Sequence, residues 1–420
     1  MKAGENGSAA GGVRPWLLSM SVVLLLSVSG ALWTRWNTHS PSAQQPAGGA
    51  SQPHTVALPN PSAESPEPAA GPVMMAPPSQ PALPPATPYA RQLVNAVCRL
   101  DRARTPLTPE EAEKWKENLE QLIERGADGA RAIAEFLQTN VDVRLGRPGV
   151  ELLGVDSVRE ALFNALVRIG GPEAITATLQ TLQTTAVPRE IALLARNLDI
   201  LVPEAHRQDA LGAAREVLAM AASGKLRGSD VAPLFEVLQN YGGPDIVPEL
   251  QQAAVTWQYY SPIALASIPE GAGIPALAQM AESNGSGTTM ALQLLAQLSG
   301  KQNEARMSLL AQAKAGKIPA SAWPFLSAAL AGNEFRFQNS ALSDPLLGNR
   351  GSISTAYVSA GNQTICNAFN PASQTEDELH GRIAFLDQLR NVTSQPAAVE
   401  AILQADQLLT NRLAFFQAAP

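Results

Sequence analysis

Two stretches of the sequence decide the fold: VREALFNALVRIGGP at Val158–Pro172 and DVAPLFEVLQNYGGP at Asp230–Pro244. Aligned on their shared Gly-Gly-Pro, they match at apolar or aromatic positions, which are Leu162 with Leu234, Phe163 with Phe235, Leu166 with Leu238, and Ile169 with Tyr241. Spacings of three and four residues are typical of one face of an α-helix. Glycine then ends that helix, and proline opens the next one. The chain therefore contains two copies of a helix–break–helix unit.

The copies lie 72 residues apart, an interval that divides into two units of about 36 residues. An intermediate unit fits between them, with an apolar helix at Ile191–Leu198, a break at Pro203 and a second helix at Ala210–Met220. Looser copies of the same plan surround Gly126, Gly271 and Gly300. Helix pairs that repeat at this interval indicate an α-solenoid, in which each pair buries its apolar face against its neighbours.

Residues that typically cap or end helices support these predicted helices. Thr108-Pro109-Glu110-Glu111 is a capping box with proline at the first helical position, and Gly126 ends the helix that follows. Asp156 is placed to cap the helix of the first copy. We therefore expect an all-α fold over residues 89–332.

The sequence VREALFNALVRIGGPEAI resembles a unit of the HEAT-repeat family, with an apolar first helix, a glycine break and a proline-led second helix. The family's Asp-Val-Arg trio is present only roughly, as Asp156-Ser157-Val158-Arg159. The resemblance covers about residues 110–332 and is strongest at 155–185. It implies a curved helical scaffold that binds partner proteins, usually without catalysis. A fold does not by itself define a function.

The N-terminus carries an apolar run from Pro15 to Thr34, 20 residues without a charge. As a helix it would span roughly 30 Å, the thickness of the hydrocarbon core of a bilayer. Lys2 and Arg14 precede the run and Arg35 follows it, so residues 1–14 are expected in the cytoplasm and the rest of the chain across the membrane. The alternative is a cleaved signal peptide that ends near Ser29-Gly30-Ala31. Both interpretations export the large domain.

Residues 37–88 contain 14 prolines, no lysine or arginine, and only Glu64 and Glu67 as charges. Such a segment cannot bury enough apolar surface to offset its ordering entropy, which predicts a disordered spacer. A proline-rich ligand for a partner's aromatic groove, centred on Pro77–Pro81, is the alternative.

Beyond residue 332 the sequence predicts two further parts, an irregular segment and a helical hairpin. Residues 333–374 are expected to be irregular, apart from a small hairpin of Ile353–Val358 and Gln363–Cys366 about Gly361-Asn362. Residues 375–416 begin with a second capping box, Thr375–Glu378, and predict a C-terminal helical hairpin. This hairpin either caps the array or docks a partner.

The composition and the absence of known motifs argue against several classes of function. The net charge is −7, from 30 lysines and arginines against 37 acidic residues, and no basic run is present, so a nucleic-acid binder is not expected. The sequence lacks G-x-S-x-G, H-E-x-x-H and phosphate-loop motifs. His206 and His380 have no convergent partners in sequence and are interpreted as solvated helix residues. We therefore expect no enzymatic activity, no cofactor and no metal.

Two groups of residues are site candidates. Trp257, Tyr259 and Tyr260 cluster in a chain poor in aromatics, and they either contact a partner or fill gaps between stacked repeats. Cys98 and Cys366 would share an oxidising compartment after export, where they form a disulfide or stay as buried thiols.

Together these features predict a membrane-tethered helical-repeat scaffold for protein–protein interaction at the cell envelope, with a protein partner that the sequence does not identify. The alternative is an exported enzyme or ligand-binding protein that uses the concave face or the 333–374 segment.

Overall fold

The computed structural model describes residues 83–99, 107–145, 147–226, 229–283, 285, 287–337, 354–360, 363–370 and 373–418. The chain divides into two units, Met1–Gln80 and Pro81–Pro420, and every described residue belongs to the second. The expectations for residues 1–14, for the transmembrane helix at 15–34 and for nearly all of the linker lie outside the described residues. None of the helices in the described ranges combines the length and the apolar character that a membrane span requires.

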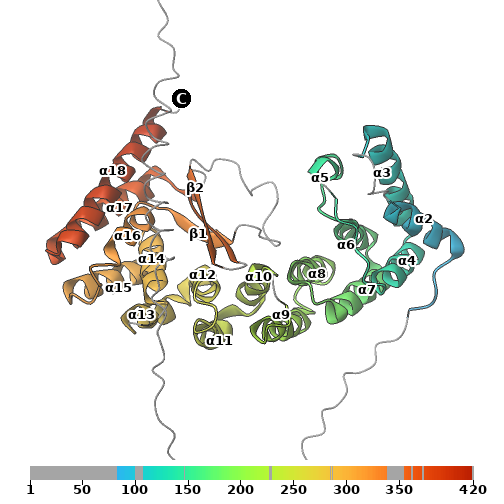
Figure 1. Cartoon of the computed structure of the whole chain (residues 1–420), viewed down its shortest axis with the longest axis horizontal. Coiled ribbons are helices and arrows are strands. Elements are labelled where there is room, and N and C mark those ends of the chain that lie inside the picture. The colour runs from blue at the N-terminus through green and yellow to red at the C-terminus, as the bar shows by residue number, and fades with distance from the viewer. Residues whose placement is uncertain are drawn as a thin grey trace, which may run out of the picture. The chain divides into compact units, whose positions relative to one another are not determined.

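The described unit is predominantly helical, and its helices pack in two rows (Figure 1). In the first row each helix contacts the next; its members are α3 (Pro109–Glu124), α6 (Val158–Ile169), α8 (Pro188–Leu201), α10 (Ala232–Tyr241), α12 (Tyr260–Ser267), α14 (Thr288–Leu298), α16 (Trp323–Leu330) and α18 (Pro396–Ala418).

The second row holds the alternate helices. Contacts connect α2 (Pro88–Cys98), α4 (Ala127–Leu137), α7 (Gly171–Thr184) and α9 (Arg207–Ala222) in that order. They likewise connect α11 (Val247–Ala253), α13 (Ile274–Glu282), α15 (Asn303–Lys314) and α17 (Glu376–Val392). Short elements lie in three connections: α5 (Arg147–Leu153) and the 3-10 turns η1 (Gly243–Ile246) and η2 (Pro269–Gly271).

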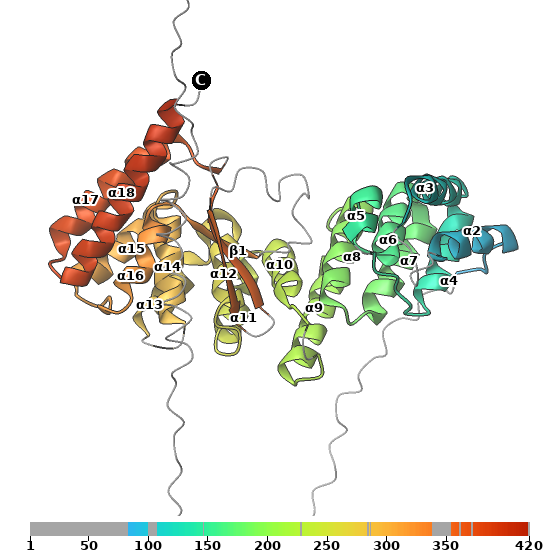
Figure 2. The same cartoon turned by 45° about the horizontal axis from the view of Figure 1, so that its top comes forward.

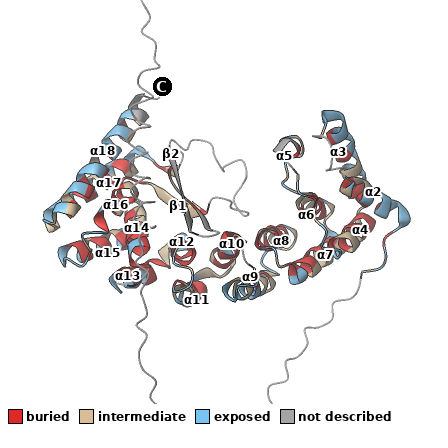
Figure 3. Ribbon diagram, viewed as in Figure 1, coloured by how far each residue is buried: buried red, intermediate tan, exposed pale blue. Residues whose placement is uncertain are grey.

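The two aligned sequence copies occupy equivalent places. The first copy forms α6 and opens α7, the second forms α10 and η1, and the predicted intermediate unit is the pair α8 and α9. The matched residues Leu162, Phe163, Leu166, Leu234, Phe235 and Leu238 are all buried in one continuous apolar core. Figure 3 shows buried residues along both rows of helices. The helical pairing that the repeat predicts is therefore present.

Local caps explain where helices begin. The capping box at Thr108 is confirmed: its hydroxyl accepts from the Glu111 N–H at 3.2 Å, and its own N–H donates to the Glu111 carboxylate at 3.0 Å. The predicted cap at Asp156 is wrong by one residue, because Ser157 accepts from the Glu160 N–H and caps α6. The Asp156 carbonyl accepts instead from the Leu145 N–H at 2.9 Å, so this residue belongs to the preceding connection.

The expectation of an irregular 333–374 segment needs correction. Three strands, β1 (Glu334–Phe337), β2 (Ser354–Ala360) and β3 (Gln363–Phe369), form an antiparallel sheet in the order β1-β3-β2. The predicted hairpin is β2 with β3, and Ala360 pairs with Gln363 across two residues that lie outside the described ranges. The third strand was missed because β1 is separated from its partner by more than twenty residues.

The ends of the helical region also differ from expectation. Leu83 and Ala86, assigned to the linker, pack against the core, and Thr87 caps α2. At the other end, the predicted pair of C-terminal helices is present as α17 and α18, which contact each other. The Thr375 hydroxyl caps α17 by accepting from the Glu378 N–H. The sheet lies in the connection between α16 and α17, beside α12 and α14 in both views (Figure 1, Figure 2).

Candidate interaction site

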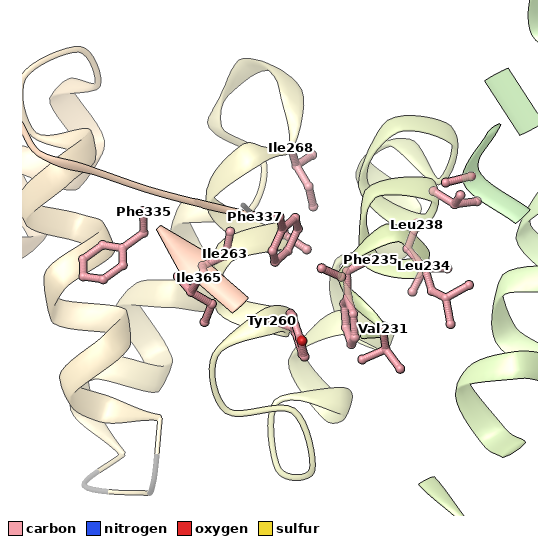
Figure 4. Packing of buried hydrophobic residues seen from close by; sticks show 14 of the residues in the cluster. Val231, Leu234, Phe235, Leu238, Tyr260, Ile263, Ile268, Phe335, Phe337 and Ile365 are labelled. Atoms are coloured by element: carbon pink, nitrogen blue, oxygen red, sulfur yellow. The ribbon is translucent and has the colours of Figure 1, made fainter. Parts of the chain in front are cut away.

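The predicted aromatic cluster is built into the core. The ring of Tyr260 stacks on Phe235 with centroids 5.4 Å apart and lies 5.6 Å from Phe337 of β1 (Figure 4). Its hydroxyl donates to Asp230 Oδ1 at 2.6 Å, and the residue is fully buried. Tyr260 therefore fills space between α10, α12 and the sheet. Trp257 and Tyr259 are half-buried and pack against the same core.

The sheet is attached to α14 through β1. The Phe335 N–H donates to Gln297 Oε1 at 2.8 Å, and Lys301 Nζ lies 3.1 Å from a carboxylate oxygen of Glu334. Phe335, Phe337 and Ile365 are buried and face the helices in Figure 4. One side of the sheet thus belongs to the core of the helical unit.

A buried arginine joins α17 to the ends of two first-row helices. Arg382 donates to the carbonyls of Ala296 and Gln297 in the last turn of α14, at 3.4 and 2.8 Å. It also donates to Ala329 and Leu330 at the end of α16, both at 3.3 Å. Cations are favoured at helix C-termini because the carbonyls there lack partners. Burial lowers the pKa of Arg382, and the carboxylate of Glu378, 3.0 Å away, opposes that shift.

A second arginine acts in the same way from α18. Arg412 donates to the Ala331 carbonyl and to Asn333 Oδ1, and its guanidinium lies 3.8 Å from the centroid of the Phe369 ring. Burial, reinforced by the charge of Arg382, lowers the pKa of Arg412 to about 10, so it stays protonated at neutral pH. These arginines hold the sheet and both C-terminal helices against the array, which is a structural role.

An apolar groove lies between α15 and α17, with a volume of about 470 Å³. Its walls are Met307, Leu310, Ala311, Lys314, Gln388, Asn391 and Val392. Met307 is 57% exposed, and flexible methionine side chains adapt to varied apolar partners. Sequence reasoning missed this groove because its walls come from segments about eighty residues apart in the chain.

A second, polar pocket of about 380 Å³ lies where α8, α9 and α10 meet. Its lining contains charges of both signs and a tyrosine: Arg196, Asp199, Pro203, Glu204, Arg207, Asn240 and Tyr241. Burial, with a further contribution from Asp199, raises the pKa of Tyr241 to about 12, so its hydroxyl is neutral at neutral pH. These groups can donate and accept hydrogen bonds and pair with charged groups of a small molecule.

The remaining candidate residues are placed as follows. His206 Nδ1 lies 2.9 Å from Asp209, and His380 Nε2 lies 3.7 Å from Glu376. Over the described ranges, no group of three or more histidine, cysteine or acidic residues could hold a metal ion. Burial raises the pKa of the Cys98 thiol to about 12. The side chain of Cys366 lies outside the described residues, so its pairing with Cys98 remains a prediction.

A scan against protein-family models finds no family that the chain matches. Searches of curated proteins and of solved structures find no match either. The fold defines the class coarsely: a predominantly helical protein with many helices packed against each other.

Proposed function

We propose that this protein is a membrane-tethered α-solenoid scaffold of HEAT-like helix pairs that binds a protein partner at the cell envelope. The observation that carries the proposal is the packing order of the helices. Each first-row helix contacts the next, from α3 to α18, and the matched repeat residues occupy equivalent core positions in α6 and α10. In repeat arrays this order creates extended surfaces, which serve chiefly for binding.

The tether is argued from the sequence. Residues 15–34 can span a bilayer, and the basic residues before them favour a cytoplasmic N-terminus. A proline-rich spacer with a reach of about 3.1 Å per residue would let the exported helical unit meet partners at some distance from the membrane.

The groove between α15 and α17 is our candidate for the partner contact. It presents exposed methionine and aliphatic surface beside Lys314 and the amides of Gln388 and Asn391. An apolar centre with a polar rim is typical of protein–protein contacts. The occupant would bring an apolar side chain to Met307 and polar groups to the rim.

The test uses the full-length chain, affinity-purified from native membranes after cross-linking. Met307→Glu places a charge in the groove and should remove the captured partner. Val255→Glu is the matched control, because Val255 is 78% exposed and lies outside the groove. A protein captured equally by the wild type and both variants would place the contact elsewhere, and no specific capture by the wild type would contradict the scaffold proposal.

The polar pocket favours a second candidate, an exported ligand-binding protein. Two arginines and two carboxylates line one site, which suits a small molecule that carries both charges. A thermal-shift screen of small zwitterions against the wild type and Arg207→Ala would test it. Stabilisation of the wild type alone would support this function.

A further inference from the structure

The two edges of the three-stranded sheet differ. At the β1 edge, the Phe335 N–H donates to Gln297 of α14, and Glu334 pairs with Lys301, so helix side chains cover this edge. Strand β2 forms the opposite edge. Among the strands that the structure describes, β3 is the only partner of β2. The β2 edge is therefore where a further strand could pair.

The register shows which residues face outward at that edge. Ala360 and Gln363 flank a two-residue connection, and in such hairpins the flanking pair exchanges both hydrogen bonds. Because bonding alternates along an antiparallel ladder, Thr355, Tyr357 and Ser359 direct their N–H and C=O groups away from β3. The same alternation continues from β3 to β1, so the Phe335 N–H is expected to point away from β3. That N–H does donate to Gln297, which supports the assignment.

The sequence around β2 lacks the charges and prolines that protect many edge strands. No lysine, arginine, aspartate, glutamate or proline occurs from Gly351 to Asn370. Natural sheets prevent edge-to-edge pairing with charges, prolines, bulges or covering segments. A seven-residue strand with threonine, tyrosine and valine and without charge favours pairing with another strand.

We propose that the β2 edge pairs with the β2 edge of a second copy of this chain, antiparallel about a two-fold axis at Tyr357. The outward positions 355, 357 and 359 are symmetric about this residue. The pairing places Tyr357 opposite its own copy and Thr355 opposite Ser359, so every outward N–H meets a C=O and no like charges face each other. Two-fold contacts need such self-complementary surfaces. The two three-stranded sheets then become one continuous sheet.

The test measures the mass of the full-length chain in detergent by sedimentation over a dilution series. The wild type should approach twice the monomer mass of 44.2 kDa at high protein concentration and dissociate on dilution. Tyr357→Lys and Tyr357→Glu should each be monomeric, because like charges lie opposite each other at the axis. An equimolar mixture of the two variants should recover the dimer, since the charges then attract.

Two controls keep the test decisive. Val255→Lys adds the same charge at an exposed position outside the sheet and should leave the dimer unchanged. Circular dichroism melts of both Tyr357 variants should match the wild type, which shows that the helical unit is intact. A wild type that stays monomeric, or Tyr357 variants that dimerise separately as well as the wild type, would overturn the proposal. A mixture that stays monomeric would also overturn it.

Discussion

Arg159 and Glu190 form a two-bond ion pair inside the core: Arg159 Nε lies 2.6 Å from Glu190 Oε1, and Nη2 lies 2.9 Å from Oε2. The arginine also donates to the Leu137 carbonyl at the end of α4, and Thr185 Oγ1 donates to the carboxylate at 2.6 Å. The arginine side chain is 3% exposed and the glutamate side chain 11%. This pair therefore joins α4, α6 and α8 across three consecutive helix pairs.

Breaking this pair should destabilise the array strongly. Arg159→Met leaves the Glu190 charge buried without its partner, and we expect a loss of about 3–5 kcal/mol in the free energy of unfolding. The double variant Arg159→Met/Glu190→Met should recover much of it. Arg168→Met, which breaks the half-exposed pair with Glu120, should change stability by less than about 1 kcal/mol. Urea denaturation followed by circular dichroism gives the free energy of unfolding of all three variants. Equal losses of stability in Arg159→Met and Arg168→Met would contradict the argument.

Leu166→Ala tests whether the repeated apolar face is the core. Leu166 is fully buried, so truncation should leave a cavity and reduce stability by about 2–5 kcal/mol. Leu403→Ala removes the same atoms from a residue that is 53% exposed, and its effect should stay within about 0.5 kcal/mol. The urea midpoint of each variant reports the difference, and the prediction fails if Leu166→Ala leaves the midpoint unchanged.

A single methyl group at Gly300 should disturb the arginine site of the C-terminal region. A Cβ there would lie 2.3 Å from Cζ of Arg382, whose guanidinium is held by four carbonyls and cannot move aside freely. Gly300→Ala should therefore reduce stability by about 1–3 kcal/mol.

The matched control for that variant is Gly212→Ala in α9, where a Cβ meets no atom within 4 Å. It should stabilise the protein by about 1 kcal/mol, because alanine favours a helix over glycine. Thermal melts should show a lower melting temperature for Gly300→Ala and a higher one for Gly212→Ala than for the wild type. A shift in the same direction for both variants would contradict the predicted clash.

The junction between the linker and the helices should be sensitive to acid. Asp128 accepts from the Thr87 N–H at 2.9 Å and from Thr87 Oγ1 at 2.6 Å. Burial acts to raise the pKa of Asp128, but these hydrogen bonds and the charge of Arg131 outweigh it, so the pKa is lowered.

Because the folded pKa lies below the unfolded one, this carboxylate stabilises the fold at neutral pH. Its contribution is lost as the pH falls from about 4 through the folded value. Asp128→Asn should destabilise the protein at neutral pH and show a smaller loss between about pH 5 and pH 3 than the wild type. Urea melts across this range measure how the free energy of unfolding of each protein changes with pH. The same change in both proteins would refute the role assigned to Asp128.

The proposed membrane tether predicts a specific extraction and protease pattern. If residues 15–34 remain as an anchor, the native protein should stay with membranes during alkaline extraction and retain an N-terminus before Pro15. Protease added to intact spheroplasts should cut residues 37–82 first, because unfolded proline-rich chain is accessible while packed helices are not. A soluble product that starts near Leu32 would exclude the anchor but keep the export. Digestion only after lysis would contradict the orientation.

The sequence alone determined the repeat and many helix ends. The matches between Val158–Pro172 and Asp230–Pro244 predicted α6, α10 and the breaks that follow them. The capping box at Thr108 and the side-chain cap at Thr375 mark the predicted starts of α3 and α17. These features could be predicted because helix periodicity and capping depend on residues within one or two turns of each other.

Only the tertiary structure decided what the remaining residues do. Tyr260 is a core residue because Phe235 and Phe337, from other segments, cover its ring. Strand β1 exists because β3 and Gln297 satisfy its backbone groups, and the groove at Met307 forms because α17 lies beside α15. Each of these depends on which elements become neighbours in space. Contacts between residues tens of positions apart leave no periodic signal in one sequence. Local sequence patterns therefore predict the helices, but only the packing decides which helix surfaces are buried and which are exposed.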